Sequence, residues 1–315
     1  MALAAYQCLK LHQDGHYPET RMNRRAWTML LILGAIWGAS YLFIKIGVRD
    51  LSPAIVAWLR VALAAAVLVP LAASRGGLRL PPGSAVALIV LAATQVAVPF
   101  VLIGVGEKEV SSSMAGILVA STPLFIALLA LRLDHEERSE GTRMWGVLAG
   151  FAGVSILLGV DLGGSQAELL GGIAIVVAGL GYAIGAFINK RRFTGPDPIG
   201  IAAWVMVVST GLLAPFALAT LPDAAPGLGP LASVAALGVV GTGIAFAIFF
   251  SLLAAVGPAR TMIVTYLVPA FAVAYGVLLL GEEISVASVG GLALIVGGSY
   301  LAAQGGGDAV ALAPE

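Results

Sequence analysis

The sequence predicts an all-α integral membrane protein with ten transmembrane helices, arranged as two inverted five-helix repeats around a central cavity. Of the 315 residues, 59% are hydrophobic and 11% are charged, which is more apolar surface than a soluble domain of this size can bury. The second half also repeats landmarks of the first at a constant offset of 145 positions. The matching pairs are Trp37 and Tyr182, Lys45 and Lys190, and Pro53 and Pro198. The composition indicates lipid as the solvent, and the offset indicates an internal duplication.

Ten apolar runs define the predicted spans, since a helix needs about 20 mostly apolar residues to cross the hydrocarbon core. They cover residues 27–47, 53–73, 84–104, 112–132, 142–160, 168–189, 198–220, 230–253, 258–280 and 286–303. Five spans fall in a first repeat over residues 27–160 and five in a second repeat over residues 168–303. Because five is odd, the second repeat enters the membrane upside down relative to the first, as in many secondary transporters.

The distribution of Lys and Arg predicts the orientation, because cytoplasmic loops are enriched in these residues. With a cytoplasmic N-terminus, thirteen cations outside the spans face inward, and two, Arg49 and Lys108, face outward. We therefore expect a multi-pass protein of the cell inner membrane with cytoplasmic tails at 1–26 and 304–315. Residues 1–26 are polar and contain no apolar core of the kind that a signal peptide needs.

The first span carries Trp37, Ser40 and Tyr41 about one helical turn apart. Belt aromatics lie at the membrane interface, whereas Trp37 lies near the middle of the span. A water-filled cavity therefore competes with simple packing as the environment of these side chains. Lys45 and Arg60 fall within a turn or two of the outer surface, which favours a structural role with their charges reaching toward water.

The second and third spans differ in polarity. Apart from Arg60 and Trp58, span 53–73 is aliphatic, which is the composition of a lipid-facing helix. Span 84–104 contains Gln95, whose amide needs either an interhelical hydrogen bond or a cavity with water. Pro99 frees a backbone carbonyl one turn earlier, which suits both alternatives.

The fourth and ninth spans each carry a proline near the middle, beside hydroxyl side chains. Ser121 precedes Pro123 in the first copy, and Thr265 and Tyr266 precede Pro269 in the second. Each proline alone indicates a packing kink. Their paired occurrence predicts two kinked helices that face each other near the midplane, where transporter sites are usually found.

The remaining spans are distinguished by their glycine, aromatic and hydroxyl residues. Spans 142–160 and 286–303 are striped with glycine, which favours close helix packing. The acidic residues Glu137 and Glu282 lie in the loops that follow spans 112–132 and 258–280, and both are expected to be solvated. Span 168–189 contributes Tyr182. Thr242 lies between two glycines in span 230–253, where the glycines favour a hinge or close packing equally.

These motifs also carry a resemblance. The segments WGASYLFIKIGVRDLSPAIVAWLR (37–60) and PARTMIVTYLVPAFAVAYGVLLLGEEIS (258–285), with the Pro123 helix, Glu137 and Gly146, are similar to the drug/metabolite transporter (DMT) superfamily. Two EamA-type repeats match over about residues 27–303, and the ten-span amino-acid exporters of the YddG type are the most similar group. The resemblance implies that spans 1, 3, 4, 6, 8 and 9 surround the cavity, spans 2 and 7 lie outside it, and spans 5 and 10 join the halves. Tyr182-Ala183 in place of Trp37-Gly38 implies that the site is not exactly symmetric.

The predicted function is a secondary transporter that exports aromatic or neutral amino acids, or related small metabolites, by alternating access. No Asp or Glu lies near the middle of any predicted span, so coupling through a buried carboxylate is disfavoured, and facilitated diffusion or exchange is expected. Deep cations are scarce, which argues against a phosphorylated solute. The alternatives are an exporter of drug-like cations and a nucleotide-sugar or sugar-phosphate carrier. An enzyme would need a catalytic constellation, which the spans lack.

The candidate site follows from these polar and aromatic positions. The predicted cavity lining is Trp37, Ser40, Tyr41, Gln95, Ser121, Tyr182, Thr242, Thr265 and Tyr266. The predicted helix kinks or gating positions are Pro99, Pro123 and Pro269. With one cysteine and three histidines, all in polar segments, we expect no metal and no cofactor. The expected partners of this monomer are a small-molecule substrate and the lipid bilayer, and no nucleic acid.

Overall fold

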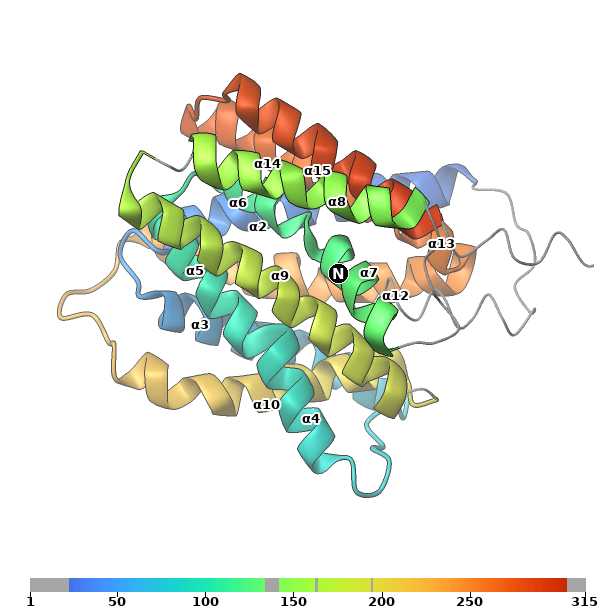
Figure 1. Cartoon of the computed structure of the whole chain (residues 1–315). Helices are drawn as coiled ribbons and strands as arrows, with labels where there is room; N and C mark the ends of the chain where they lie inside the picture. The colour runs from blue at the N-terminus through green and yellow to red at the C-terminus, as the bar shows by residue number, and fades with distance from the viewer. Residues whose placement is uncertain (1–22, 134–141, 162–163, 194, 305–315) are drawn as a thin grey trace, which may run out of the picture.

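The computed structural model describes residues 23–133, 142–161, 164–193 and 195–304, and every predicted span is helical within them (Figure 1). The first repeat contains α2 (Arg24–Gly47), α3 (Pro53–Ser74), α4 (Ala85–Ala92), η1 (Ala93–Ala97), α5 (Val98–Glu109), α6 (Ser112–Val119), α7 (Thr122–Leu133), α8 (Thr142–Ile156) and η3 (Leu157–Asp161). The second contains α9 (Gln166–Arg192), α10 (Pro198–Leu218), α11 (Leu228–Gly238), η4 (Val239–Ile244), α12 (Ala245–Val256), α13 (Pro258–Thr261), α14 (Val264–Leu280) and α15 (Val286–Gln304). Eight helical segments of the described residues are long and apolar enough to cross a membrane, and α14 and α15 are shorter apolar helices. The predicted all-helical membrane fold is confirmed.

Helix starts are fixed by side chains that accept the free backbone N–H groups of the first turn. The Asn23 side chain accepts from the Ala26 N–H at 2.8 Å, and Ser52 accepts from the Ile55 N–H at 3.2 Å, with Pro53 in the first turn of α3. Ser111 plays the same part for α6, where its hydroxyl accepts from the Met114 N–H at 3.1 Å. Such caps matter here because lipid offers no hydrogen bonds to an open helix end.

Both repeats are interrupted at matching places. The π turns η1 and η4 fall in the third and eighth spans, and the offset of 145 relates them to within two residues. The fourth span breaks at Ala120 and Ser121, directly before Pro123. The ninth span breaks at Met262 and Ile263, whereas Pro269 lies inside the continuous helix α14. The second break therefore lies upstream of its proline, so Pro269 does not mark it.

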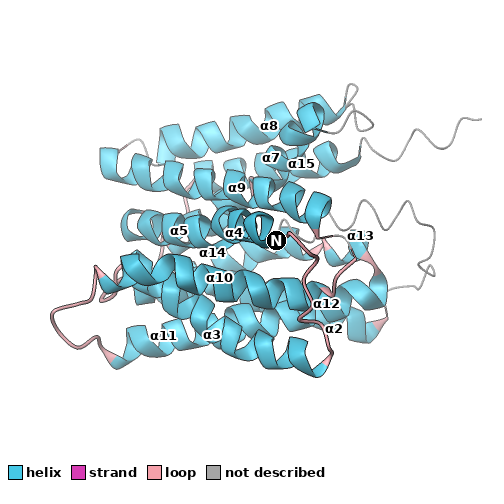
Figure 2. Cartoon of the chain, turned by 90° about the horizontal axis from the view of Figure 1, so that it is seen from below, coloured by secondary structure: helices cyan, strands magenta, loops and turns pink. Residues whose placement is uncertain are grey.

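The spans pair across the repeats as an inverted duplication requires. The first span, α2, packs against α14 and against α11 and α12. Its counterpart α9 packs against α6 and α7, and against α4 and α5. Spans 1 and 6 thus each contact the fourth and third spans of the opposite repeat, and the space between these pairs becomes the centre of the bundle (Figure 2).

Helices α8 and α15 join the repeats along one edge of the bundle, side by side in Figures 1 and 2. A Cβ placed on Gly146 would lie 2.6 Å from the backbone nitrogen of Ala302. A Cβ on Gly153 would lie 2.8 Å from the carbonyl oxygen of Gly291. Glycine therefore allows direct contact between the two backbones. The predicted packing of the two glycine-striped spans is confirmed.

Helices α3 and α10 pack extensively on each other on the other side of the bundle. The expectation that these two spans lie outside the cavity is wrong. Arg60 of α3 and Ala202, Val205 and Met206 of α10 all line the central cavity. An aliphatic composition could not distinguish a helix that faces lipid from one that closes a cavity with small apolar side chains.

Two adjacent glycines of α15 provide a matched test of the α8–α15 contact. We expect Gly298→Ala to lower the thermal unfolding midpoint of the detergent-solubilised protein, because its Cβ would lie 2.6 Å from the nitrogen of Gly150. Overpacking of this kind costs about 1–3 kcal/mol. Gly297→Ala has nothing within 4 Å of its new Cβ and should leave the midpoint unchanged or raise it. Equal midpoints for the two variants would contradict the contact.

Candidate functional site

A cavity at the centre of the bundle contains about 800 Å³ of space that protein atoms do not fill, part of it open to solvent. Both repeats contribute to its wall. The lining residues are Trp37, Ser40, Tyr41, Ile44, Arg60, Gln95, Val96, Phe100, Ile103, Val119, Tyr182, Ala202, Val205, Met206, Gly241, Phe246 and Val268. Five of the predicted site residues, Trp37, Ser40, Tyr41, Gln95 and Tyr182, therefore meet around one space.

One wall of the cavity is aromatic. The Trp37 ring stacks on Phe249 with a centroid distance of 5.6 Å, and its edge meets Phe246 at 6.2 Å. Both phenylalanines belong to α12, which carries further stacked rings one turn along. The indole is 8% exposed, and its ring orientation is fixed by the second repeat. Aromatic pairs in these geometries stabilise beyond the area that they bury.

Arg60 is the cavity residue whose role the sequence analysis missed. It is buried, and its Nε donates a hydrogen bond to Thr242 Oγ1 at 2.9 Å. Its guanidinium carbon lies 3.7 Å from the centre of the Phe100 ring. The expectation of a cation reaching outward to water is wrong for this residue, because α3 turns the side chain into the bundle instead. Thr242 does not line the cavity itself, but it holds the guanidinium that does.

Gln95 reaches the cavity from the π turn η1. The residue is 5% exposed, and its Oε1 has no hydrogen-bond partner among the described residues. Helix α9 approaches closely here, since a Cβ on Gly185 would lie 2.5 Å from the Gln95 Cβ. The amide oxygen is therefore an acceptor held at the cavity wall, where a solute can satisfy it.

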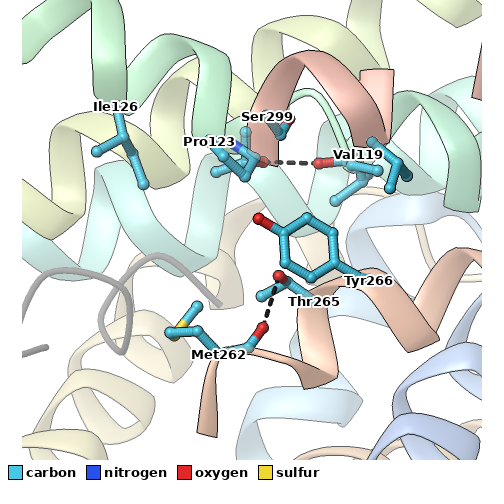
Figure 3. A pocket seen from close by; sticks show the side chains of 10 residues that line it. Val119, Pro123, Ile126, Met262, Thr265, Tyr266 and Ser299 are labelled. Atoms are coloured by element: carbon cyan, nitrogen blue, oxygen red, sulfur yellow. Dashed lines mark hydrogen bonds between the residues drawn. The ribbon is translucent and has the colours of Figure 1, made fainter. Parts of the chain in front are cut away.

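A second, smaller pocket of about 410 Å³ lies between the breaks of the fourth and ninth spans (Figure 3). Three predicted residues, Pro123, Thr265 and Tyr266, line this pocket and not the central cavity. Val119 borders both spaces. The predicted single site is thus divided into two, with Val119 at the boundary.

Three further predicted residues line neither space. Ser121 is buried, and its hydroxyl donates to the Leu118 carbonyl at 2.6 Å, which satisfies it at the helix break. Pro99 lies just after η1 and packs toward Gly181 of α9. Pro269 is buried within α14. These three residues shape helices without forming a wall of either space.

A polar layer that the sequence analysis did not anticipate lies one turn beyond the cavity. Helix α5 extends to Glu109, five residues past the predicted end of its span, so Glu107 is part of the helix. Glu107 is fully buried. The partly buried Lys45 donates to the backbone carbonyls of Glu107 at 2.7 Å and Val110 at 2.8 Å. The observation that no Asp or Glu lies near the middle of a span holds, but α5 buries a carboxylate near its end. The four-residue spacing from Ile103 was the available signal, because it places Glu107 on the cavity face of the helix.

Glu282 is not a solvated loop charge, as was expected, but a half-buried bridge between the repeats. Its carboxylate accepts from the backbone N–H groups of Ser112 and Ser113 at 2.7 and 2.9 Å, and from the Ser113 hydroxyl at 2.6 Å. Burial raises the pKa of Glu282, but the hydrogen bonds from Ser113 and Ser112 outweigh it and lower the pKa overall. An anion at the N-terminus of α6 is also favoured by the helix dipole. Glu137, its counterpart in the first repeat, lies outside the described residues.

Removal of the Glu282 charge should therefore give a pH-dependent loss of stability. A lowered folded-state pKa contributes stability above the ordinary Glu pKa of about 4.3, and this contribution is lost as the pH falls through the folded-state value. We expect the free energy of unfolding of Glu282→Gln to be about 1 kcal/mol lower than that of the wild type at neutral pH, a value discounted for the partial exposure of the side chain. The variant should therefore melt at a lower temperature. The two proteins should converge only as the pH falls below the folded-state pKa of Glu282, which lies below the ordinary value. A difference that persists unchanged in acid would argue against the charge, and Glu283→Gln is the exposed control.

Comparison with known proteins agrees with this architecture. The model of the EamA-like transporter family matches the chain twice, at residues 25–159 and 169–304. A transporter of Archaeoglobus fulgidus is 26% identical over 88% of this chain and 98% of its own length. The Escherichia coli inner membrane transporter YedA is 28% identical over 81% of this chain and 83% of its length.

Two further similarities bear on function and fold. An Escherichia coli K12 protein named "probable amino-acid metabolite efflux pump" is 25% identical over 89% of this chain and 95% of its own length. One crystal structure superimposes with a TM-score of 0.62 at 22% identity, over 88% of this chain and 96% of that one, which shows a shared fold. With both repeats matched almost end to end, this multi-pass membrane protein belongs to the EamA-like transporter family.

Proposed function

We propose that the chain is a secondary transporter of the inner membrane that exports aromatic or neutral amino acids, or related small carboxylates, by alternating access. The observation that carries the proposal is the central cavity, in which one guanidinium faces an aromatic wall built by both repeats. The orientation with both termini in the cytoplasm is part of the proposal. In that orientation, the loops at residues 48–52, 219–227 and 281–285 lie outside.

Arg60 is suited to hold the carboxylate of such a solute. A guanidinium has five N–H donors in a planar fork that matches a carboxylate. Of the three guanidinium nitrogens of Arg60, only Nε has a hydrogen-bond partner among the described residues. No salt bridge among those residues involves this side chain. The contacts with Thr242 and Phe100 fix its plane. A bound carboxylate would supply the charge partner that a buried cation needs.

The rest of the cavity suits the remainder of an amino acid. The orphan Oε1 of Gln95 and the hydroxyls of Tyr41 and Tyr182 are acceptors for an ammonium group. Trp37 and Phe246 offer ring surface to an aromatic or aliphatic side chain. The name of the Escherichia coli efflux pump adds support for this solute class.

The alternative solutes fit this cavity less well. A phosphorylated solute normally needs several cations, and the nearby Lys45 already donates to two backbone carbonyls. A lipophilic cation would meet the positive charge of Arg60, and no carboxylate among the described residues lines the cavity to offset it. One cation with aromatic surface therefore favours a zwitterion or a small organic acid.

Arg60→Gln provides the direct test. In proteoliposome counterflow, we expect the wild-type protein to prefer phenylalanine over its decarboxylated amine by tenfold or more, because a site built for a hydrogen-bonding group rejects the analogue that lacks it. Arg60→Gln should lose most of this preference, and Arg60→Lys should restore part of it. Arg49→Gln, at an exposed position outside the cavity, is the matched control. Wild-type phenylalanine flux in Arg60→Gln would rule out this role for Arg60.

A further inference from the structure

We propose that Glu107 is a proton-binding site, and that closing the outer end of the transporter requires one proton on its carboxylate. The inference rests on the proposed function for its direction, because a proton taken up outside would then be exchanged for an exported solute. It rests on independent observations for the site itself. These are the burial of Glu107, the absence of a hydrogen-bond partner for its carboxylate oxygens among the described residues, and the bonds that close this end of the bundle.

Glu107 differs from three other described carboxylates near the same end, Asp50, Asp161 and Glu282. Asp50 accepts from the Gly227 N–H at 2.8 Å, and Asp161 accepts from Ser285 and Ser288 at 2.6 and 2.7 Å. Glu282 has the three donors given above. In contrast, neither carboxylate oxygen of Glu107 has a hydrogen-bond partner among the described residues, although the side chain is fully buried.

The groups that surround Glu107 do not compensate a negative charge with hydrogen bonds. Lys45 and Tyr41 face it from α2, Arg60 from α3, and Glu282 from the 281–285 loop. The Lys45 ammonium donates to backbone carbonyls instead of the carboxylate, and the guanidinium of Arg60 is directed to Thr242. Helix α9 contacts α5 at this level through Gly171 and Ile175, which carry no charge.

An ionised carboxylate that is buried without hydrogen bonds is strongly disfavoured, because nothing replaces the water that solvated it. The neutral acid avoids most of this cost, because the carboxyl group itself then carries no charge. The attraction of Lys45 opposes protonation, but its geometry brings no direct bond to the carboxylate oxygens. The closed arrangement of this end therefore favours Glu107 with its proton bound.

The same end is held shut by bonds between the repeats. Glu282 binds the start of α6, the Ser52 and Thr220 hydroxyls lie 2.7 Å apart, and Asp50 binds Gly227. Opening this end to release a solute would break these bonds and bring water to Glu107, which keeps the carboxylate ionised after its proton has left on the inside. Closing would return a proton from outside water to a carboxylate oxygen.

The central cavity offers the path by which the proton of Glu107 is released toward the inside. Ile103, one helical turn from Glu107, lines it, as does Tyr41, one turn from Lys45. When a solute binds from the inside, its ammonium brings a positive charge toward this layer. The proton then leaves Glu107 for cavity water, so one proton enters for each solute that leaves.

Infrared spectroscopy tests the site without any substrate. The purified full-length protein at neutral pH should show the carbonyl band of a protonated carboxylic acid, and Glu107→Gln should lose it. Glu109→Gln is the matched control, since Glu109 is exposed on the same helix, and it should keep the band. If Glu107→Gln folds poorly, Glu107→Asp is the second variant, and it should show the carboxylic acid band at a shifted frequency. The absence of this difference between wild type and Glu107→Gln would overturn the inference.

Spin labels test the link to closure, again without substrate. After replacement of Cys8, cysteines introduced at Lys108 and Glu283 would carry the labels. Both are exposed positions, and they lie in opposite repeats. In the labelled protein with Glu107 intact, alkaline pH should add a longer distance between the two labels, and acidic pH should remove it. Glu107→Gln should show the short distance at every pH. A wild-type distance distribution that ignores pH would overturn the coupling.

Transport then separates this inference from the proposed function. With no membrane potential, one-for-one exchange predicts about tenfold solute accumulation per pH unit, and Glu107→Gln, whose outer end is expected to stay closed, should give none. Amino-acid flux that ignores the gradient would overturn proton coupling and leave the proposed function intact. A pH-dependent closure without amino-acid flux would uphold the role of Glu107 and contradict the substrate class.

Discussion

The hydrogen bond from Arg60 to Thr242 joins the two repeats at the centre of the bundle. A charged group at this depth needs partners, because neither lipid nor apolar side chains can solvate it. The guanidinium obtains them from a hydroxyl of the second repeat and from the face of Phe100. Its remaining donors keep a polar space in an otherwise apolar core. The position of the cavity therefore depends on this contact between α3 and η4.

The duplication explains why helical irregularities meet at that space. The π turns η1 and η4 occupy equivalent places in the third and eighth spans, and they present Gln95 and Gly241 to the cavity. A π turn widens a helix locally and is frequent at functional sites. The breaks in the fourth and ninth spans border the second pocket (Figure 3). Inversion brings each irregularity opposite its counterpart, whereas α8 and α15 remain regular enough to pack through glycine along most of their length.

The fold was predictable because each signal was local and repeated. Apolar runs of about 20 residues and a constant offset define the spans, and glycine stripes identify the α8–α15 contact. The rotation of a helix about its own axis was not predictable in the same way. Arg60 lies in an aliphatic helix that could face lipid or protein, and that rotation decides whether it is a surface cation or a cavity residue. Glu107 was missed because hydropathy ended the span at residue 104, while the helix continues to Glu109. Ser121 and Pro269 were assigned from residue type, and their hydroxyl and ring are used within their own helices.

The solute site proposed for this protein lies between Trp37, Arg60 and Tyr182 in the larger cavity. Photolabelling with a diazirine analogue of phenylalanine, followed by mass spectrometry to locate the modified residues, tests this position. We expect labelling in α2 near Trp37 and in α9 near Tyr182, and excess unlabelled phenylalanine should prevent it. Protected labelling confined to the second pocket near Tyr266, or labelling that excess phenylalanine does not reduce, would rule out this position of the solute.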